Sequence, residues 1–329
     1  MNFHRFPASG MPHQGERVAD QVVIVRAGAG AEVPLRDGRR LGLAEYGDPD
    51  GVPCFYFHFA PGSRLDPAVL FARCPAALAG IRLIAVDRPG FGRSDRQPGR
   101  RFADFSSDVL AVADCLGLDR FAVLGLSAGG GYALACASLI AERVSVTLVV
   151  SGMPSVSRPQ ERRELALGSR VLYRLAGPVP WLVQLVTALL LRLTIRLLRR
   201  PGRPAMREDM GLPFPPDVLA DPQLRPLVIA DLTEAVIRPG TRGLVDELAL
   251  YARPWGFRLD QITVPVHLWH GDSDVSAPTA LARAAAAVIP ACQAVFVPGG
   301  HTAPFGHLEE ILRPIREACQ RAPGREASQ

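Results

Sequence analysis

The feature that most constrains the fold is a regular alternation of short apolar runs with helical patterns. The apolar runs are rich in branched and aromatic residues, which is typical of buried strands. They cover residues 53–60, 81–87, 120–126, 143–152, 262–271 and 293–299. Helical spacing of apolar residues occurs at 104–118, 128–140, 278–289 and 307–319. Strands separated by helices in this way predict an α/β fold, a mostly parallel twisted sheet flanked by helices with right-handed crossovers.

The alternation is interrupted once. Residues 154–257 contain helical stretches and prolines but no convincing strand, so we predict an inserted helical cap there. The core then consists of residues 29–153 and 258–322, and the segment 37–51 is expected to form a hairpin at the edge of the sheet. Residues 1–28 are predicted to be a loose extension and residues 323–329 a frayed tail.

Composition and charge indicate a globular protein and argue against several other classes. The chain has 329 residues, 48% of them hydrophobic and 21% charged, which suits one large globular unit. The net charge of +5 is mild and no basic run is interleaved with aromatic residues, which argues against a nucleic-acid partner. Six cysteines include no CxxC pair, so we interpret them as reduced, buried thiols of a cytoplasmic protein. The first 20 residues lack the continuous apolar region of a secretory signal.

One stretch of the predicted cap, residues 180–200, is strongly apolar. The uncharged stretch that overlaps it, residues 176–191, contains two prolines and is shorter than the roughly 20 apolar residues that a membrane span requires. Gln184, Arg192, Arg196 and Arg199 share one side of a helical wheel, so we expect an amphipathic cap helix packed over the core. The alternative is contact with a membrane surface through Arg192, Arg196, Arg199, Arg200 and Arg203.

The run FAVLGLSAGGG (121–131) places Ser127 in a G-x-S-x-G pattern between a predicted strand and a predicted helix. Glycines on both sides permit a tight turn that holds the serine hydroxyl out at the carboxyl end of the sheet. The helix that follows directs its amide groups to the same place, where they stabilise developing negative charge. Ser127 is therefore a candidate nucleophile.

A serine hydroxyl needs a base, and the base needs an orienting acid. The predicted strand 262–271 is followed by Asp272 and Asp274, and the strand 293–299 by His301. All of these residues follow the carboxyl ends of strands that the sequence predicts to be parallel. Serine, acid and histidine thus occur in the chain order expected for a triad in this architecture.

These motifs together resemble those of the α/β-hydrolase fold family over about residues 30–320. HFAPGSR (58–64) is similar to the family's oxyanion loop and GLSAGG (125–130) to its nucleophile elbow. The remaining matches are DRPGFGRSD (87–95), GDSD (271–274) and GGHTAPFGHLEE (299–310). The resemblance implies the fold more specifically than it implies the reaction.

The resemblance implies Ser127 as nucleophile, His301 as general base and Asp274, rather than Asp272, as the acid, because Asp274 matches the family pattern G-x-x-D. His307 is a rival base that we expect at the start of a helix, and His267 is interpreted as a structural histidine within a strand. His270, at the end of that strand, has no assigned partner.

The oxyanion hole is implied to use the backbone amides of Ala60 and Ala128. Phe59 departs from the family here, because a glycine is usual at this position. A phenylalanine pays a steric cost if its φ is positive, and its ring is expected to crowd the acyl pocket. One outcome is a slightly reshaped loop with normal hydrolysis, and the other is weaker binding of the oxyanion.

The sequence therefore predicts a serine hydrolase that cleaves a carboxylic ester or related acyl compound through an acyl-enzyme. The substrate is expected to be an apolar or acyl small molecule, and no metal or organic cofactor is implied. Two alternatives stay open. One is another reaction on the same triad, namely carbon–carbon bond hydrolysis, lactonisation or cyclisation of a natural product. The other is a ligand-binding relative without catalysis, which only Phe59 favours.

Overall fold

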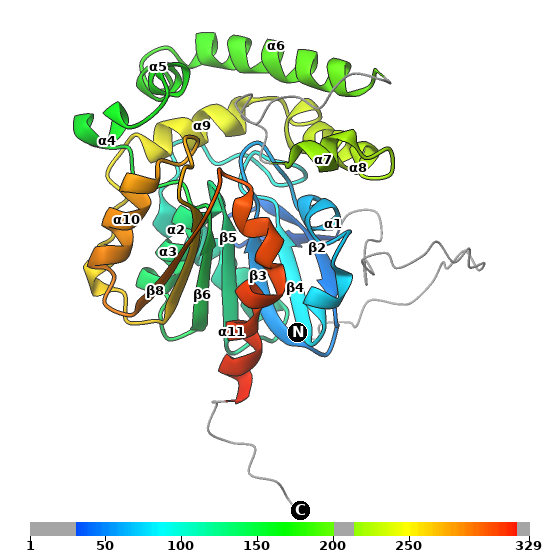
Figure 1. The fold of residues 1–329 in the computed structure, drawn as a ribbon, viewed down its shortest axis with the longest axis vertical. Helices are drawn as coiled ribbons and strands as arrows, with labels where there is room; N and C mark the ends of the chain where they lie inside the picture. The colour runs from blue at the N-terminus through cyan, green and yellow to red at the C-terminus, as the bar shows by residue number, and fades with distance from the viewer. Residues whose placement is uncertain (1–30, 201–213, 321–329) are drawn as a thin grey trace, which may run out of the picture.

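The structure is a computed structural model that describes residues 31–200 and 214–320. The predicted extension 1–28, the predicted tail 323–329 and Arg203 lie outside the described residues. The described part forms one sheet with helices on both faces and a group of helices above one end of the strands (Figure 1).

The sheet has eight strands in the order β1-β2-β4-β3-β5-β6-β7-β8. Only the pairings of β1 with β2 and of β2 with β4 are antiparallel. The strands are β1 Ala31–Pro34, β2 Arg40–Gly47, β3 Val52–Phe57, β4 Ile81–Val86, β5 Phe121–Leu126, β6 Val144–Val150, β7 Val266–Gly271 and β8 Cys292–Val297. The mostly parallel sheet flanked by helices is the predicted fold class. The edge hairpin, however, covers residues 31–47 rather than 37–51, because the turn lies at 35–39 and the chain beyond Gly47 leads into β3.

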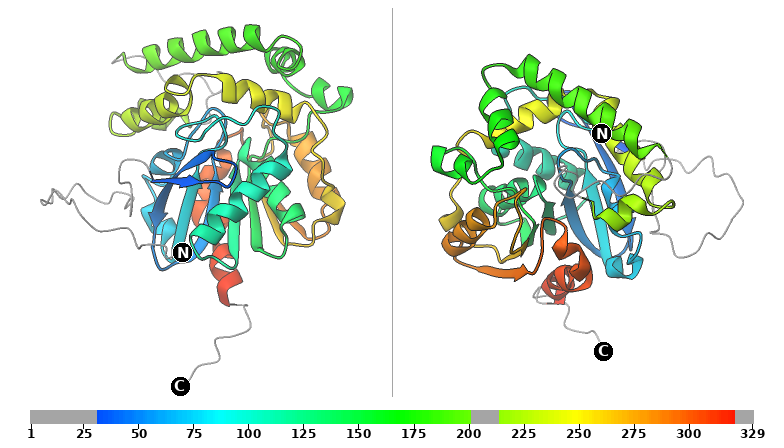
Figure 2. Two further views of the ribbon diagram at one scale, coloured as in Figure 1. Left: turned by 180° about the vertical axis from the view of Figure 1, so that it is seen from behind. Right: turned by 45° about the horizontal axis from the view of Figure 1, so that its top comes forward.

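Two helical layers cover the sheet. The helices α2 Phe102–Cys115, α3 Gly129–Leu139 and α10 Thr279–Val288 lie on one face, and α1 Asp66–Leu70, η1 Pro75–Leu78 and α11 Leu308–Gln320 lie on the other (Figures 1 and 2). Side chains alternate along β5 between the two layers. Phe121 and Val123 pack with α2 and α3, while Ala122 and Leu124 pack with α11. Strand β5 is therefore buried on both faces, as is typical of a central strand in a parallel sheet.

The interruption predicted between the two parts of the core is helical. It contains α4 Pro159–Arg163, α5 Leu167–Leu175, α6 Pro180–Leu198, α7 Pro216–Ala220, α8 Arg225–Leu232, η3 Thr233–Ile237 and α9 Arg242–Tyr251. These helices, which we call the cap, lie above one end of the sheet (Figure 1). The hydroxyl of Tyr251 in α9 donates to the carbonyl of Ala128, so the cap meets the sheet at the carboxyl end of β5. The short η4 Leu259–Gln261 and η5 Ala303–His307 complete the described helices.

The interpretation of the cysteines as buried thiols is wrong in part. Cys54 and Cys136 are buried, but Cys74 and Cys292 are half-buried and Cys115 is exposed. All five are free thiols. Cys115 is exposed because it ends α2 on the side of the helix that faces solvent.

Candidate active site

Ser127 lies in the sharp turn between β5 and α3. Its φ is +52°, a left-handed conformation that is uncommon for a residue with a side chain. The Ser127 N–H donates to the carbonyl of Val150 at 2.9 Å, and the Ser127 carbonyl accepts from the amides of Gly130 and Met153 at 2.9 and 2.8 Å. These three bonds hold the strained turn in place, which is typical of a functional residue.

Glycines make the turn possible. A Cβ on Gly125 would overlap the carbonyl oxygen of Gly129, and a Cβ on Gly129 would overlap the carbonyl oxygen of Phe57. Strand β5 can therefore turn directly into α3 only if both positions lack a side chain. The turn leaves Ser127 partly accessible above the sheet.

His301 and Asp274 lie beside this serine. The Nε2 atom of His301 lies 3.1 Å from Ser127 Oγ, and its Nδ1 atom lies 2.7 Å from Asp274 Oδ2. An N–H on Nδ1 donating to the carboxylate leaves Nε2 free to accept the serine proton. Ser127, His301 and Asp274, 174 and 27 positions apart along the chain, thus form one hydrogen-bonded series.

Asp274 is held as a carboxylate. Burial alone would raise the pKa of its carboxyl, but the hydrogen bond from His301 and the backbone hydrogen bonds outweigh it, and the pKa is lowered. The backbone amides of Ser276 and Ala277 donate to Oδ1 at 2.8 and 2.9 Å. This oxygen is therefore fixed by the turn, while Oδ2 faces the histidine.

The other candidate acids and bases have structural contacts. Asp272 accepts a hydrogen bond from the Gly299 amide and braces the turn. His307 lies at the end of η5, where it pairs with Glu310 at 3.5 Å. His267 is half-buried within β7. Of these, none forms a hydrogen bond to Ser127 in the described part of the chain.

His270 contacts the acid, Asp274, which was not predicted from the sequence. Its Nε2 atom lies 2.7 Å from the carbonyl of Ala277 and 3.3 Å from Asp274 Oδ2. Burial lowers its pKa, so the ring stays neutral and donates from Nε2. Asp274 Oδ2 therefore faces two imidazoles. Nothing in the sequence identifies the second contact, because it depends on how the turn 271–277 folds back over the end of β7.

The two implied oxyanion amides lie free. Neither Ala60 N–H nor Ala128 N–H has a hydrogen-bond acceptor among the residues that the structure describes. Phe59 does not have the strained conformation, because only Ser127 and Ser151 combine a positive φ with a side chain in the described ranges. Its ring is buried and packs edge-to-face on Phe214 at 5.1 Å. Phe59 thus fills space beneath the cap without straining the loop.

The segment 87–95 supports this loop. Asp87 accepts from the Arg64 amide and guanidinium at 2.6 Å each, and the Ser94 hydroxyl donates to the Asp87 carbonyl at 2.6 Å. Trp255 packs in an aromatic cluster with Phe102 and Phe257. The contacts of the segment 87–95 and those of Trp255 are therefore structural contacts in the core.

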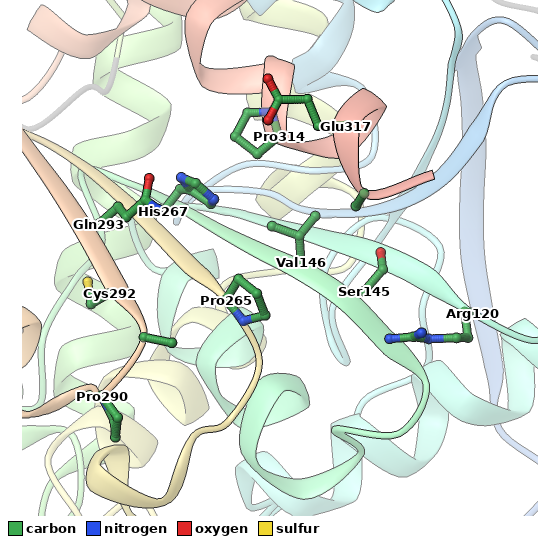
Figure 3. Close-up of a pocket in the computed structure, with 12 residues that line it drawn as sticks. Arg120, Ser145, Val146, Pro265, His267, Pro290, Cys292, Gln293, Pro314 and Glu317 are labelled. Atoms are coloured by element: carbon green, nitrogen blue, oxygen red, sulfur yellow. The ribbon is translucent and has the colours of Figure 1, made fainter. Parts of the chain in front are cut away.

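A cavity of about 610 Å³ lies at the opposite end of the strands (Figure 3). It is lined by residues at the beginnings of β6, β7 and β8, among them Ser145, His267 and Cys292, and by α11. Ser127, Asp274 and His301 follow the other ends of these parallel strands. The cavity is therefore separated from the triad by the length of the sheet.

The geometry agrees with the comparison to known proteins. A model of the alpha/beta hydrolase fold matches residues 58–308, about three quarters of the chain. The chain belongs to the α/β-hydrolase fold family. The match includes the Ser127 turn, the cap and the Asp274 and His301 loops.

Individual α/β-hydrolase relatives are more distant. The chain is 34% identical to a non-heme chloroperoxidase of Streptomyces lividans over 128 residues, 38% of this chain and 45% of that protein. It is also 34% identical to a 2-hydroxymuconate semialdehyde hydrolase of Pseudomonas putida over 127 residues, 38% of this chain and 44% of that protein. The chain thus spans less than half the length of these curated relatives.

A solved esterase of Exiguobacterium antarcticum has the same fold. It superposes with a TM-score of 0.60 at 18% identity and covers 88% of this chain and 99% of its own. Identity this low shows a shared α/β-hydrolase fold and leaves the substrate to be argued from the site.

Proposed function

We propose that the chain is a serine hydrolase that cleaves a carboxylic ester or related acyl compound through an acyl-enzyme. The observation that carries the proposal is the hydrogen-bonded series from Ser127 Oγ through His301 to Asp274, at 3.1 and 2.7 Å. A nucleophile within reach of a base that is itself oriented by a carboxylate is the arrangement that acyl transfer needs.

In the acylation step, Ser127 Oγ attacks the acyl carbon while His301 Nε2 takes the hydroxyl proton. The carbonyl π bond opens to an oxyanion, and Asp274 stabilises the imidazolium. When the carbonyl re-forms, the bond to the leaving group breaks and His301 returns the proton to that group. Water then attacks the acyl-serine with His301 as base, which releases the acid and regenerates Ser127.

The free amides of Ala60 and Ala128 are proposed to bind the oxyanion. Backbone N–H groups that are already unpaired need no reorganisation when charge develops. Each such donor typically contributes about 100- to 1,000-fold to turnover. The apolar composition of the cap supports an apolar or acyl small molecule as substrate.

The test is labelling by a fluorophosphonate probe, which modifies activated serines. We expect the purified wild-type chain to be labelled and Ser127→Ala to be unlabelled. The matched control is Ser107→Ala, which removes an exposed hydroxyl on α2 that donates to the Ala103 carbonyl within its own helix. An unlabelled wild type, or labelling that survives Ser127→Ala, would contradict the proposal.

Hydrolysis of a carbon–carbon bond is the second candidate. It is favoured by the similarity to a 2-hydroxymuconate semialdehyde hydrolase. The two reactions separate on substrate profiling, because an ester hydrolase turns over simple aryl esters readily, whereas an enzyme adapted to a carbon–carbon bond is slow on them and faster on 2-hydroxymuconate semialdehyde.

A further inference from the structure

The cap helix α6 has two apolar faces, and only one of them is covered. Val183, Leu191 and Ile195 are buried against the rest of the cap, where α6 contacts α8, η3 and α9. The opposite face is open. It consists of Trp181, Leu185, Val186, Leu189, Leu190 and Leu193, with exposures between 37% and 66%. The expectation that the apolar face of this helix packs over the core is thus only half fulfilled.

The preceding cap helix, α5, also carries exposed apolar side chains. Leu167 and Val171 are 73% and 44% exposed. We call these eight residues of α5 and α6 the apolar cap face. Figures 1 and 2 show α6 along the outer edge of the molecule, on the side of the cap away from the sheet. Large apolar side chains exposed together on neighbouring helices of a folded protein indicate an interaction site.

The charge around the apolar cap face has one sign. Residues 165–200 include six arginines and no aspartate or glutamate. Four of the arginines are exposed, Arg192 and Arg196 on α6 and Arg199 and Arg200 directly after its last residue. Within the described ranges none of these four forms an ion pair with a carboxylate. The partner that covers this face must therefore accept both apolar side chains and cations.

A groove runs beside the face. Its volume is about 300 Å³, and Trp181, Leu185, Arg192, Val236 and Ile237 are among the residues that line it. Because Trp181 and Leu185 belong to both the groove and the apolar cap face, whatever covers the face also reaches the groove.

We propose that the apolar cap face is a docking surface for an anionic lipid bilayer. The acyl region takes up the leucines, the lipid phosphates pair with the arginines, and Trp181 lies at the interface between them. A second copy of the chain fits less well, because two such faces would bring unpaired arginines together without a carboxylate to neutralise them. This proposal does not depend on the proposed reaction.

The helix lies on the bilayer rather than across it. By length and composition α6 is the one helix in the described part of the chain that could cross a membrane. Its inner residues, however, pack against α8, η3 and α9, so a span would require the cap to come apart. A face that is apolar on the outside and flanked by arginines is the pattern of an interfacial helix.

The experiment measures binding of the full chain to vesicles of phosphatidylcholine alone and of phosphatidylcholine with phosphatidylglycerol. We expect the wild type to co-sediment with the anionic vesicles and to be released as salt is raised. Leu185→Gln/Leu189→Gln/Leu193→Gln should weaken this binding by at least about tenfold. Arg192→Gln/Arg196→Gln/Arg199→Gln should remove the preference for the anionic vesicles.

The matched control is Leu139→Gln/Val288→Gln/Val295→Gln, which replaces three exposed apolar residues on α3, α10 and β8. It should bind as the wild type does. Fluorescence places the contact, because Trp181 emission should shift to shorter wavelength on binding and be quenched by brominated lipid, and Trp181→Phe should lose that signal while still co-sedimenting.

Three results would overturn the proposal. They are a wild type that does not bind anionic vesicles, leucine variants that bind as tightly as the control, and equal binding to neutral vesicles. Analytical ultracentrifugation gives a further outcome, since a dimer that the leucine variants dissociate, without vesicle binding, would assign the face to self-association instead.

Discussion

Two imidazoles face the same carboxylate oxygen of Asp274. His301 donates to it at 2.7 Å, and His270 Nε2 lies 3.3 Å away on the other side. The His270 ring is fixed by its bond to the Ala277 carbonyl, and the Ala277 amide in turn holds Asp274 Oδ1. His270 therefore acts as a positioning residue for the acid.

At this scale we predict that His270→Phe lowers kcat for acyl hydrolysis by about tenfold with little change in KM. His270 is one of the neighbours that lower the pKa of Asp274, so its removal raises that pKa, and the variant should lose more activity than the wild type as the pH falls towards the pKa of this carboxyl. His267→Phe, on the same strand but lining the remote cavity, is the control. A variant whose activity falls equally at all pH values would show a general packing defect and contradict this role.

The residues of the triad were predictable because each follows a strand whose apolar pattern is clear, and because the glycines around Ser127 announce a sharp turn. The conformation of Phe59 was not predictable, because φ at that position depends on how the ring packs against Phe214 in the cap. Contacts between distant segments are set by tertiary packing, which a single sequence does not reveal.

At the scale of elements, α8 reaches the loop before α1 through a buried carboxyl. Asp231 Oδ1 accepts from the Ser63 amide at 2.9 Å and the Ser63 hydroxyl at 2.6 Å. Burial raises the pKa of Asp231 to about 8, despite these hydrogen bonds. Asp66, buried nearby, has a raised pKa because of its own burial and the Asp231 charge.

The raised pKa values of Asp231 and Asp66 predict that the stability of the fold depends on pH. Asp231 keeps its proton in the folded state below about pH 8 and loses it on unfolding above about pH 4, so unfolding releases a proton between those values. The contribution of Asp231 to the free energy of unfolding is therefore complete below about pH 4. It is lost as the pH rises towards about 8, by up to about 1.4 kcal/mol per pH unit.

We expect Asp231→Asn, which keeps an acceptor for Ser63 but cannot ionise, to flatten the fall in the free energy of unfolding between pH 6 and 8. Urea denaturation at several pH values measures it. The control is Asp217→Asn on α7, an exposed carboxyl whose pKa is lowered by the hydrogen bond from Arg73 and which therefore does not titrate in this range. A variant that follows the wild-type slope would refute the assignment.

The elements themselves were predicted unevenly. The strands of the parallel part lie within a few residues of their expected positions, because each is a short apolar run between polar or turn-forming residues. In α6 the composition predicted a helix, but the sequence did not reveal which apolar face would be covered, since Val183 and Val186 are equally apolar and only their contacts distinguish them.

At the scale of the molecule, cap and core are joined through buried charge. Glu247 of α9 lies 2.7 Å from both the Arg88 and the Arg100 guanidinium groups, and it accepts from the Tyr132 hydroxyl at 2.8 Å. Arg88 and Arg100 belong to core loops and Tyr132 to α3, and the side chains of both arginines are fully buried. Glu247 of the cap thus pairs closely with two buried cations of the core, and the neighbouring Asp246 lies 3.9 Å from one of them, Arg100.

Breaking this junction should affect both stability and the site. Glu247→Gln leaves the buried Arg88 without its carboxylate and leaves Arg100 with only Asp246 at 3.9 Å, which we expect to lower the free energy of unfolding by about 3–5 kcal/mol. Asp246→Asn, at the adjacent residue, removes an ion pair with the partly exposed Arg96 and a longer contact of 3.9 Å to Arg100, so it should cost less than Glu247→Gln, about 1 kcal/mol. Tyr251, four residues beyond Glu247 on α9, bonds the carbonyl of Ala128 beside Ser127, so a displaced α9 reaches the turn itself. Fluorophosphonate labelling should therefore slow in Glu247→Gln under conditions where circular dichroism shows it folded, and stay unchanged in Asp246→Asn. Equal stability and equal labelling in the two variants would mean that the cap is held by its apolar contacts alone.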